Sequence, residues 1–577
     1  MLSLVARLKP YTGAVLLTLV FVLVQVLAEL GLPTLMAGII DRGVMGKNQT
    51  AIFTGGLWMA AVALTGAAAS IAAAWVSARL AAGYGRDLRS AVFRKATNLT
   101  VDEFSRFGAA TLITRTTNDV TQVQSFLVMS LRMLASAPLM AVGGVVMALT
   151  LDSGLAIVLL LTVPVLILVI VFLARRGVKY FRIVQEKIDR LNLVLRETLT
   201  GVRVIRAFDR QDFDSQRFEN ANLDLASISL KTQKLMAAVM PGMMFAMSLT
   251  SVLLVWFGGL RIEAGTLKVG GLMAFLQYAA QILFSLMMLS MLFVLLPRAA
   301  VSAGRINDVL SLPEDTPSSG QGSGRSVSPL GAEIEFRDVS FRYAGAEQSA
   351  LTGISFIVPA GKTTALIGGT GSGKTTLLQL VARFHDATSG QVLVDGLDVK
   401  LWSRTALRHR LGLSSQKARL FTGTVAENLR WGDSGAADEI LRSALDTAQA
   451  RDFVEAMGGG LQARIDQAGV NLSGGQKQRL SIARTLVRRP AVLLLDDSFS
   501  ALDTRTDAAL RNSLKQRTPG STVLLVAQRV ATVREADQIV VVDEGRVAGI
   551  GTHGELSAAC PVYQEIVASQ EGREERT

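Results

Sequence analysis

The first part of the chain is dominated by long apolar segments. Each is long enough to cross a bilayer core of about 30 Å, which takes about 20 helical residues. The sequence therefore predicts an all-α membrane domain with six spanning helices within residues 1–311. The six segments are Thr12–Leu35, Phe53–Leu80, Phe126–Thr150, Gly154–Leu173, Leu235–Leu260 and Val269–Leu296.

The connections between these segments alternate in length and charge. The short ones carry few cations: Asp41–Thr50, Leu151–Ser153 and Arg261–Lys268. The two long ones carry many: Arg86, Arg89, Arg94, Lys95, Arg106 and Arg115 in one, and Arg175, Arg176, Lys179, Arg182 and Lys187 through Lys234 in the other. Cation-rich loops stay in the cytoplasm. We therefore expect a cytoplasmic-membrane protein whose termini, long loops and C-terminal part are cytoplasmic.

The long loops continue the helical periodicity of the spans and contain few Gly or Pro, so the helices are expected to run well past the bilayer. Leu99–Phe104 predicts a short helix with a Thr cap in the first loop. Phe208–Phe213 lies at the corresponding place in the second. Both stretches could also be solvated loop tips.

Few polar side chains interrupt the apolar segments. They are Gln25 and Glu29 in the first, Arg132 in the third, and Gln277 and Gln281 in the sixth. Polar groups at membrane depth usually face a cavity or a partner helix, which makes these residues candidates for a transport pathway. For the glutamines, hydrogen bonding between helices is an equally good explanation.

Composition supports a membrane protein, because half of the 577 residues are apolar. The formal net charge of +12 does not indicate nucleic-acid binding, since the cations are concentrated in loops and no basic stripe with interleaved aromatics is present. Cys560 is the only cysteine, which excludes an intrachain disulfide. Met1–Pro10 lacks a cleavage pattern, so the first span is expected to stay in the protein.

A second domain follows a stretch rich in Ser, Gly and Pro. This composition predicts a flexible linker at 312–331, followed by a second domain at 332–577. Within that domain, Gly368–Thr375 reads G-x-x-x-x-G-K-[ST] after the apolar run Thr364–Ile367. Backbone N–H groups of such a loop cradle phosphates, Lys374 reaches the terminal phosphates and the Thr375 hydroxyl can bind Mg²⁺.

About a hundred residues downstream, Leu472–Gln476 reads LSGGQ, and the apolar strand Val492–Leu495 ends in Asp496. The phosphate loop, the LSGGQ and this strand, in that order, resemble the nucleotide-binding domain of ABC transporters. The predicted fold class is therefore a six-helix ABC exporter membrane domain followed by an α/β P-loop ATPase domain. The resemblance makes Leu99–Phe104 and Phe208–Phe213 coupling helices, the second resting on the partner's domain.

The resemblance also assigns roles in binding ATP and Mg²⁺. Tyr343 matches the aromatic residue that stacks on adenine, Gln416 the glutamine that touches Mg²⁺ and the membrane domain, and Ser473–Gln476 the signature that contacts the partner's nucleotide. The implied metal ligands are Thr375, Gln416 and Asp496. The implied ATP-binding residues of this chain are Tyr343, Gly368, Gly369, Thr370, Gly371, Ser372, Gly373, Lys374, Thr375, Thr376, Gln416 and Asp496, with Ser473, Gly474, Gly475 and Gln476 for the partner's ATP.

Two positions depart from the family pattern. The family's general base is a Glu, and here Asp497 stands in its place, with a carboxylate one methylene shorter. Because a general base must reach its water within hydrogen-bond distance, this change weakens hydrolysis. The family's switch His is replaced by Gln528, which cannot shuttle a proton. His553 lies too far downstream to replace it.

An intact signature beside an altered base and switch resembles one subunit of a heterodimeric bacterial ABC exporter of the multidrug type, the subunit with the degenerate ATP site. The implied function is ATP-driven export of a hydrophobic or amphipathic compound, with hydrolysis mainly at the partner's site. The implied partners are a second half-transporter, membrane lipid and the exported compound, without nucleic acid. The alternatives are a homodimeric exporter and an ATP-gated channel or regulatory membrane protein with little turnover.

Overall fold

The computed structural model describes residue 4 and residues 6–312 and 331–574, in two compact units. One consists of Met1–Thr97 with Ala109–Pro313, and the other of Asn98–Gly108 with Glu314–Thr577. Almost all of the predicted linker, 312–331, lies outside the described residues.

Six long helices build the first unit within the described residues, at the positions of the six predicted spans. Five of them are long and apolar enough to cross a membrane. The fourth predicted span, Gly154–Leu173, begins a helix in which the described apolar stretch covers only Ser153–Val165. The helices are α2 (Thr12–Gly38), α3 (Gln49–Thr97), α6 (Val120–Leu151), α7 (Ser153–Ala207), α8 (Gln211–Glu263) and α9 (Val269–Leu310).

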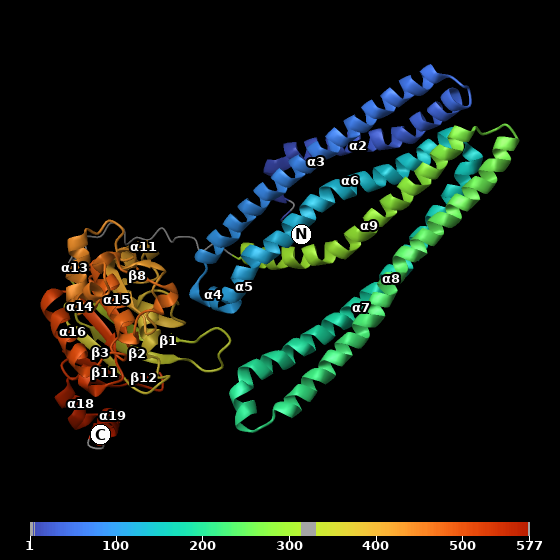
Figure 1. Cartoon of the computed structure of the whole chain (residues 1–577). Coiled ribbons are helices and arrows are strands. Elements are labelled where there is room, and N and C mark those ends of the chain that lie inside the picture. Colours follow the sequence, from blue (N-terminus) through green and yellow to red (C-terminus); the bar gives the residue numbers. More distant parts are fainter. Residues whose placement is uncertain (1–3, 5, 313–330, 575–577) are drawn as a thin grey trace. The chain divides into compact units, whose positions relative to one another are not determined.

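These helices pack side by side in pairs. Figure 1 shows α2 along α3, α6 along α9, and α7 with α8 as a long antiparallel hairpin. The 49 residues of α3 correspond to about 74 Å at 1.5 Å per residue, more than twice the thickness of a bilayer core. The prediction that the helices run well past the bilayer is therefore confirmed.

The two predicted coupling helices differ in structure. In the first loop, α4 (Val101–Phe107) begins at Thr100, whose hydroxyl accepts a hydrogen bond from the Glu103 backbone while the Glu103 carboxylate accepts one from Thr100, as the Thr cap predicts. In the second loop the prediction of a separate helix is wrong. Residues 208–210 form a turn between α7 and α8, in which Asp209 adopts a left-handed φ of 51° that Asp tolerates well.

Short helical segments complete the first unit. Two π-helical turns interrupt the long helices, which is common at functional sites. The short elements are η1 (Lys9–Tyr11), η2 (Ile39–Val44), α5 (Ala109–Thr114) and η3 (Arg115–Asp119).

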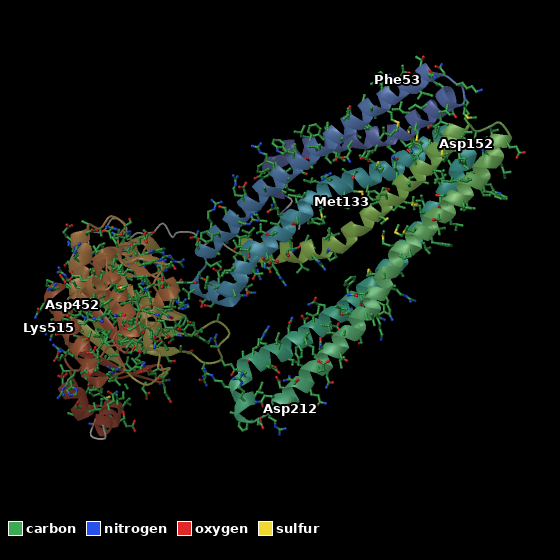
Figure 2. The ribbon with its side chains drawn as sticks, viewed as in Figure 1. Phe53, Met133, Asp152, Asp212, Asp452 and Lys515 are labelled. Atoms are coloured by element: carbon green, nitrogen blue, oxygen red, sulfur yellow. The ribbon has the colours of Figure 1, made fainter. Side chains whose placement is uncertain are left out.

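The connection between α6 and α7 is fixed by one buried carboxylate. Asp152 accepts a hydrogen bond from the Leu155 backbone at 2.8 Å, which caps α7, and pairs with the Arg261 guanidinium of α8 at 2.9 Å. Figure 2 shows Asp152 at one end of the α7–α8 hairpin and Asp212 near the other. This cap explains how helices of 32 and 55 residues can be joined by a single residue.

The second unit is built on three sheets. A four-stranded sheet has the order β2-β1-β4-β5, a six-stranded sheet has the order β12-β11-β3-β10-β9-β6, and β7 pairs with β8. The strands are β1 (Ile334–Phe341), β2 (Leu351–Val358), β3 (Thr363–Ile367), β4 (Ser389–Val394), β5 (Leu397–Asp398), β6 (Leu411–Ser414), β7 (Gly423–Thr424), β8 (Arg464–Ile465), β9 (Val492–Asp496), β10 (Thr522–Val526), β11 (Gln538–Asp543) and β12 (Arg546–Gly551).

The six-stranded sheet is buried on both faces. Along β9, Leu493 and Leu495 join one apolar cluster while Val492 and Leu494 join another, because successive side chains point to opposite faces. Continuous apolar strands of this kind are typical of a parallel sheet covered by helices on both sides. Five of the strands are parallel, and only β12 runs antiparallel.

Helices cover these sheets and carry the predicted motifs. They are α10 (Lys374–Val381), α11 (Arg404–Arg410), α12 (Val425–Arg430), α13 (Asp438–Thr447), α14 (Arg451–Ala456), η5 (Gly460–Gln462), η6 (Gln467–Gly469), α15 (Gly474–Val487), α16 (Thr504–Arg517), α17 (Val530–Val533), α18 (His553–Ala559) and α19 (Pro561–Glu574). Because β3, β9 and β10 are parallel neighbours, the residues that follow them lie at one edge of the sheet.

We expect Asp152→Ala to destabilise the first unit by about 2 kcal/mol, because it removes a helix cap and leaves Arg261 without its partner. The thermal unfolding midpoint of the protein in detergent is the measurement. Asp212→Ala is the matched control, since Asp212 is exposed in the first turn of α8. Equal midpoints for the two variants would contradict the capping role.

Candidate functional site

The phosphate loop connects β3 to α10 through a turn that only glycine fits at two positions. Gly368 has a φ of 154°, and a Cβ there would lie 2.0 Å from the Val542 carbonyl oxygen. Gly373 has a φ of 100°, and its Cβ would lie 2.5 Å from a Leu351 methyl. Side chains at these positions would push the loop away from the sheet, so the glycines hold the turn at the N-terminus of α10, where anions bind.

Lys374 is folded back onto this loop. Its Nζ donates to the carbonyl oxygens of Gly368 and Gly369 at 2.9 and 2.5 Å and to Ser372 Oγ at 3.1 Å. Burial lowers the pKa of Lys374, while the charges of Asp497 and Asp496 act in the opposite direction. The ammonium group thus lies in the loop that would hold phosphate, as predicted.

The strand acid and the loop threonine meet directly. Thr375 Oγ1 donates to Asp496 Oδ1 at 2.8 Å, which joins the start of α10 to the end of β9. Burial raises the pKa of Asp496, and the neighbouring Asp497 adds to that effect. A hydroxyl and a carboxylate oxygen side by side suit Mg²⁺, which prefers oxygen ligands and would bridge to ATP phosphates here.

Asp497 is held by two amides. Its Oδ2 accepts hydrogen bonds from Gln528 Nε2 at 2.9 Å and from Gln416 Nε2 at 3.3 Å. The residue is buried and has a left-handed φ of 46°, which is uncommon outside glycine. Burial raises the pKa of Asp497. Of the three predicted metal ligands, Gln416 therefore contacts Asp497, whereas Thr375 and Asp496 contact each other.

Tyr343 lies just beyond β1 and reaches the helix of the phosphate loop. Its hydroxyl lies 2.9 Å from Thr376 Oγ1 and donates to Gln379 at 3.2 Å. Its ring meets those of Phe341 and His385 edge-on, at centroid distances of 4.8 and 5.4 Å. The structure thus brings together Tyr343 and Thr376, two residues predicted to bind ATP.

The signature turn caps α15. Ser473 Oγ accepts from the Gln476 backbone, and Gln476 Oε1 accepts from the Ser473 backbone, a reciprocal cap that leaves the helix N-terminus intact. A Cβ on Gly475 would lie 3.0 Å from the Ala501 carbonyl oxygen, so this glycine lets the 500–502 loop pack closely. Among the described residues, no hydrogen bond joins the signature turn to Gly368–Thr375.

Gln478 is a site residue to which the sequence assigned no role. This buried amide donates to the carbonyl oxygens of Gln416 and Asp497 and accepts from the Ala501 backbone at 3.2 Å. It therefore ties three motif loops together. The sequence gives only a weak indication of this role, because a glutamine two residues after the signature looks like an ordinary helix residue. His553, by contrast, is bonded to the Tyr563 hydroxyl at 2.9 Å.

The chain matches two family descriptions in the order of its two units. Residues 15–287 match the ABC transporter transmembrane region, and residues 351–500 match the ABC transporter ATP-binding region described as "ABC transporter". The chain belongs to the ABC transporter family. It combines a helical membrane domain with an α/β ATPase domain and is an ATP-hydrolysing transporter.

Relatives of this ABC transporter share most of its length. An uncharacterised ABC transporter ATP-binding protein of Mycobacterium tuberculosis is 42% identical, over 98% of this chain and 97% of that protein. A fatty acid ABC transporter ATP-binding/permease protein of Mycobacterium bovis is 33% identical, over 83% of this chain and 75% of that protein. A multidrug efflux ATP-binding/permease protein of Mycobacterium bovis is also 33% identical, over 97% of this chain and 47% of that protein.

A solved structure shares the fold of this ABC transporter. A bacterial Atm1-family ABC exporter with ATP bound superposes with a TM-score of 0.80, over 98% of this chain and 99% of that one, at 24% identity. The chain therefore shares the fold of that exporter, with a membrane domain fused ahead of one ATPase domain. The predicted fold class is confirmed.

The raised pKa of Asp496 predicts competition between protons and Mg²⁺. An aspartic acid whose pKa is raised above its ordinary value remains protonated to a higher pH, so Mg²⁺-dependent ATP binding should weaken as pH falls through the raised pKa. Asp496→Asn should weaken Mg²⁺ dependence and flatten this acid slope. The measurement is the Mg²⁺ dependence of the binding of a fluorescent ATP analogue between pH 5 and 8. Asp212→Asn is the control. An unchanged slope in Asp496→Asn would assign it to another group.

Proposed function

We propose that this chain is one half of a heterodimeric ABC exporter and carries the degenerate ATP site. In this proposal residues 1–311 form the membrane domain, 332–577 the ATPase domain, and 312–331 the linker. The chain binds ATP and Mg²⁺ at its own site but hydrolyses ATP mainly through its partner's site. The membrane is the cytoplasmic membrane, with the ATPase domain and both termini in the cytoplasm.

The observation that carries this proposal is the hydrogen bonding of Asp497. A carboxylate that activates water needs a free oxygen within hydrogen-bond reach of that water. Here one of the two carboxylate oxygens, Oδ2, already accepts from Gln528 and Gln416, which fixes the orientation of a side chain that is shorter than the family's glutamate. The Gln528 amide cannot exchange a proton as the family's histidine does. In this proposal Asp497 and Gln528 therefore allow the phosphates of ATP to bind without activating the attacking water.

The signature supplies the other half of the argument. The Ser473–Gln476 turn keeps its cap and its glycines, and its helix N-terminus suits a phosphate. Since no described hydrogen bond joins it to this chain's own phosphate loop, it is free to serve a nucleotide held by another subunit. The proposed consensus site pairs this signature with the partner's phosphate loop.

The two coupling segments also fit a dimer. Asp102 of α4 lies 3.1 Å from His385, within the unit that contains this chain's ATPase domain. The turn between α7 and α8 instead carries Phe208, with an exposure of 74%, and Phe213 in the first turn of α8 has an exposure of 64%. Two bare aromatic side chains at a loop tip suit a docking surface on a second subunit.

The proposed cargo is a hydrophobic or amphipathic compound. Two relatives with more than 80% of this chain matched are named for fatty acid transport and multidrug efflux, and both cargo classes are apolar in large part. Export to or through lipid would need the extensive apolar helix surface that α2, α3 and α8 expose.

We expect Asp497→Glu to raise hydrolysis at this chain's site only partly, because Gln528 remains unable to act as the family's histidine. The double variant Asp497→Glu/Gln528→His should hydrolyse ATP at this site about tenfold or more faster than Asp497→Glu alone, because general acid–base catalysis contributes at least that much. Steady-state ATPase activity in lipid, with the partner's base disabled, isolates this site. Asp497→Asn is the matched control for the charge.

Full activity from Asp497→Glu alone would show that the Gln528 contact is unimportant. High activity of the unmodified site with the partner's base disabled would contradict the degenerate site altogether. Retained ATP binding in every variant shows that the fold is intact.

A further inference from the structure

The structure assembles four of the five polar residues of the spans into one seam between α2 and α9. Gln25 Nε2 donates to Glu29 Oε1 at 2.9 Å, and Gln281 Nε2 donates to the Glu29 carbonyl oxygen at 3.0 Å. Gln277 Nε2 contacts the Met36 sulfur at 3.1 Å. Arg132 makes no such contact among the described residues, so it does not belong to the seam.

Glu29 lies deep in its span. It is the only charged residue between Lys9 and Asp41, at about 30 Å from the first and about 18 Å from the second along a helix with a rise of 1.5 Å per residue. Arg132 precedes the end of α6 at Leu151 by 19 residues, or about 28 Å, which places it at the border of a 30 Å core. The deep charge of this seam is therefore a carboxylate.

The carboxylate faces away from the lipid side of α2. Leu16, Leu23 and Leu27 form an apolar stripe with exposures of 63%, 42% and 60%. At 100° per residue, Glu29 lies about 200° around the helix from Leu27. Glu29 is nevertheless only half-buried. A side chain that is partly exposed in the single chain, but does not point toward lipid, can face a cavity that a second subunit completes.

Nothing described in the chain neutralises this carboxylate. No cationic side chain among the described residues pairs with Glu29, whose side chain accepts a hydrogen bond from the neutral amide of Gln25. Beside it, Gln281 Oε1 is buried without a hydrogen-bond partner in the described structure. The Glu29 carboxylate and the Gln281 amide oxygen both accept hydrogen bonds. The seam therefore lacks a hydrogen-bond donor or a cation that would satisfy them.

The scaffold that carries the seam is firmly packed. The Tyr278 hydroxyl donates to the Leu30 carbonyl oxygen at 2.8 Å and lies 2.6 Å from Thr34 Oγ1, which ties α9 to α2 just after Glu29 in the chain. Tyr278 is fully buried in an apolar cluster with Val22 and Val26. The acceptors are thus presented on rigid helices, as a binding site requires.

We propose that Glu29, with Gln25 and Gln281, is a cation-recognising subsite of the transport pathway, and that this exporter takes amphipathic compounds bearing a positive charge. The inference rests on the proposed export function and narrows its cargo. At low dielectric a carboxylate attracts an organic cation and repels the head group of a fatty acid.

The test uses two probes of the same shape and opposite charge, tetraphenylphosphonium and tetraphenylborate. Equilibrium binding to the purified full-length protein, with its partner subunit where it co-purifies, should favour the cation. Glu29→Gln should weaken cation binding by about tenfold or more, the scale at which loss of one partner of a desolvated charge pair acts, and leave the anion unchanged. Glu29→Asp should lie between the two.

Glu263→Gln is the matched control, because it makes the same change at an exposed position at the end of α8. An unchanged thermal unfolding midpoint in detergent, together with retained ATP binding, shows that each variant is folded in both units. Unchanged cation binding in Glu29→Gln, or equal binding of both probes to the unmodified protein, would overturn the inference.

Failure of the export function itself gives a different result. ATP-dependent movement of an uncharged fluorescent lipophile into inside-out vesicles tests export without involving Glu29. If the unmodified protein moves none, the proposed function fails, whereas the binding experiment still decides on the subsite. If it moves the neutral lipophile and Glu29→Gln leaves cation binding intact, only the subsite fails.

Discussion

One hydrogen bond, from the Gln528 amide to the Asp497 carboxylate, governs how the ATP site of this chain can work. It joins the segments that follow β9 and β10, two parallel neighbours, and it engages one of the two carboxylate oxygens at the position of the family's base. Thr375 and Asp496 contact each other, and Lys374 lies on the phosphate loop. In the proposed function, binding and hydrolysis of ATP are separable, because different residues would serve each.

The membrane domain follows a similar division between scaffold and function. Apolar helices supply length and packing, while one polar seam between α2 and α9 holds the Glu29 carboxylate and the unsatisfied amide oxygen of Gln281. Buried Asp152 closes the tight connection between α6 and α7, so the long α7–α8 hairpin starts from a fixed point. Rigid helices with a few polar groups are suited to presenting a cargo site that a second subunit completes.

Local signals made most of the site predictable from the sequence. The phosphate loop, the acid after β9 and the cap at Thr100 each depend on a short motif whose geometry is set by neighbouring residues. Gln478 was not predicted, because its role depends on loops brought together only by the folded sheet.

Two further features lay beyond local signals. The pairing of Glu29 with Gln281 depends on the register of two helices separated by 252 residues, which periodicity does not specify. The turn at Asp209 was predicted as a coupling helix from the resemblance to ABC exporters, whereas in the structure residues 208–210 form a turn with Asp209 in the left-handed region.

The proposed division of labour is tested by the steady-state ATPase activity of this chain in lipid, purified alone and together with its proposed partner half-transporter. We expect little turnover alone and substantial turnover in the pair, lost when the partner's catalytic glutamate is replaced. Vigorous turnover by this chain alone would show that Asp497 is a competent base despite its bond to Gln528, and would contradict a degenerate site.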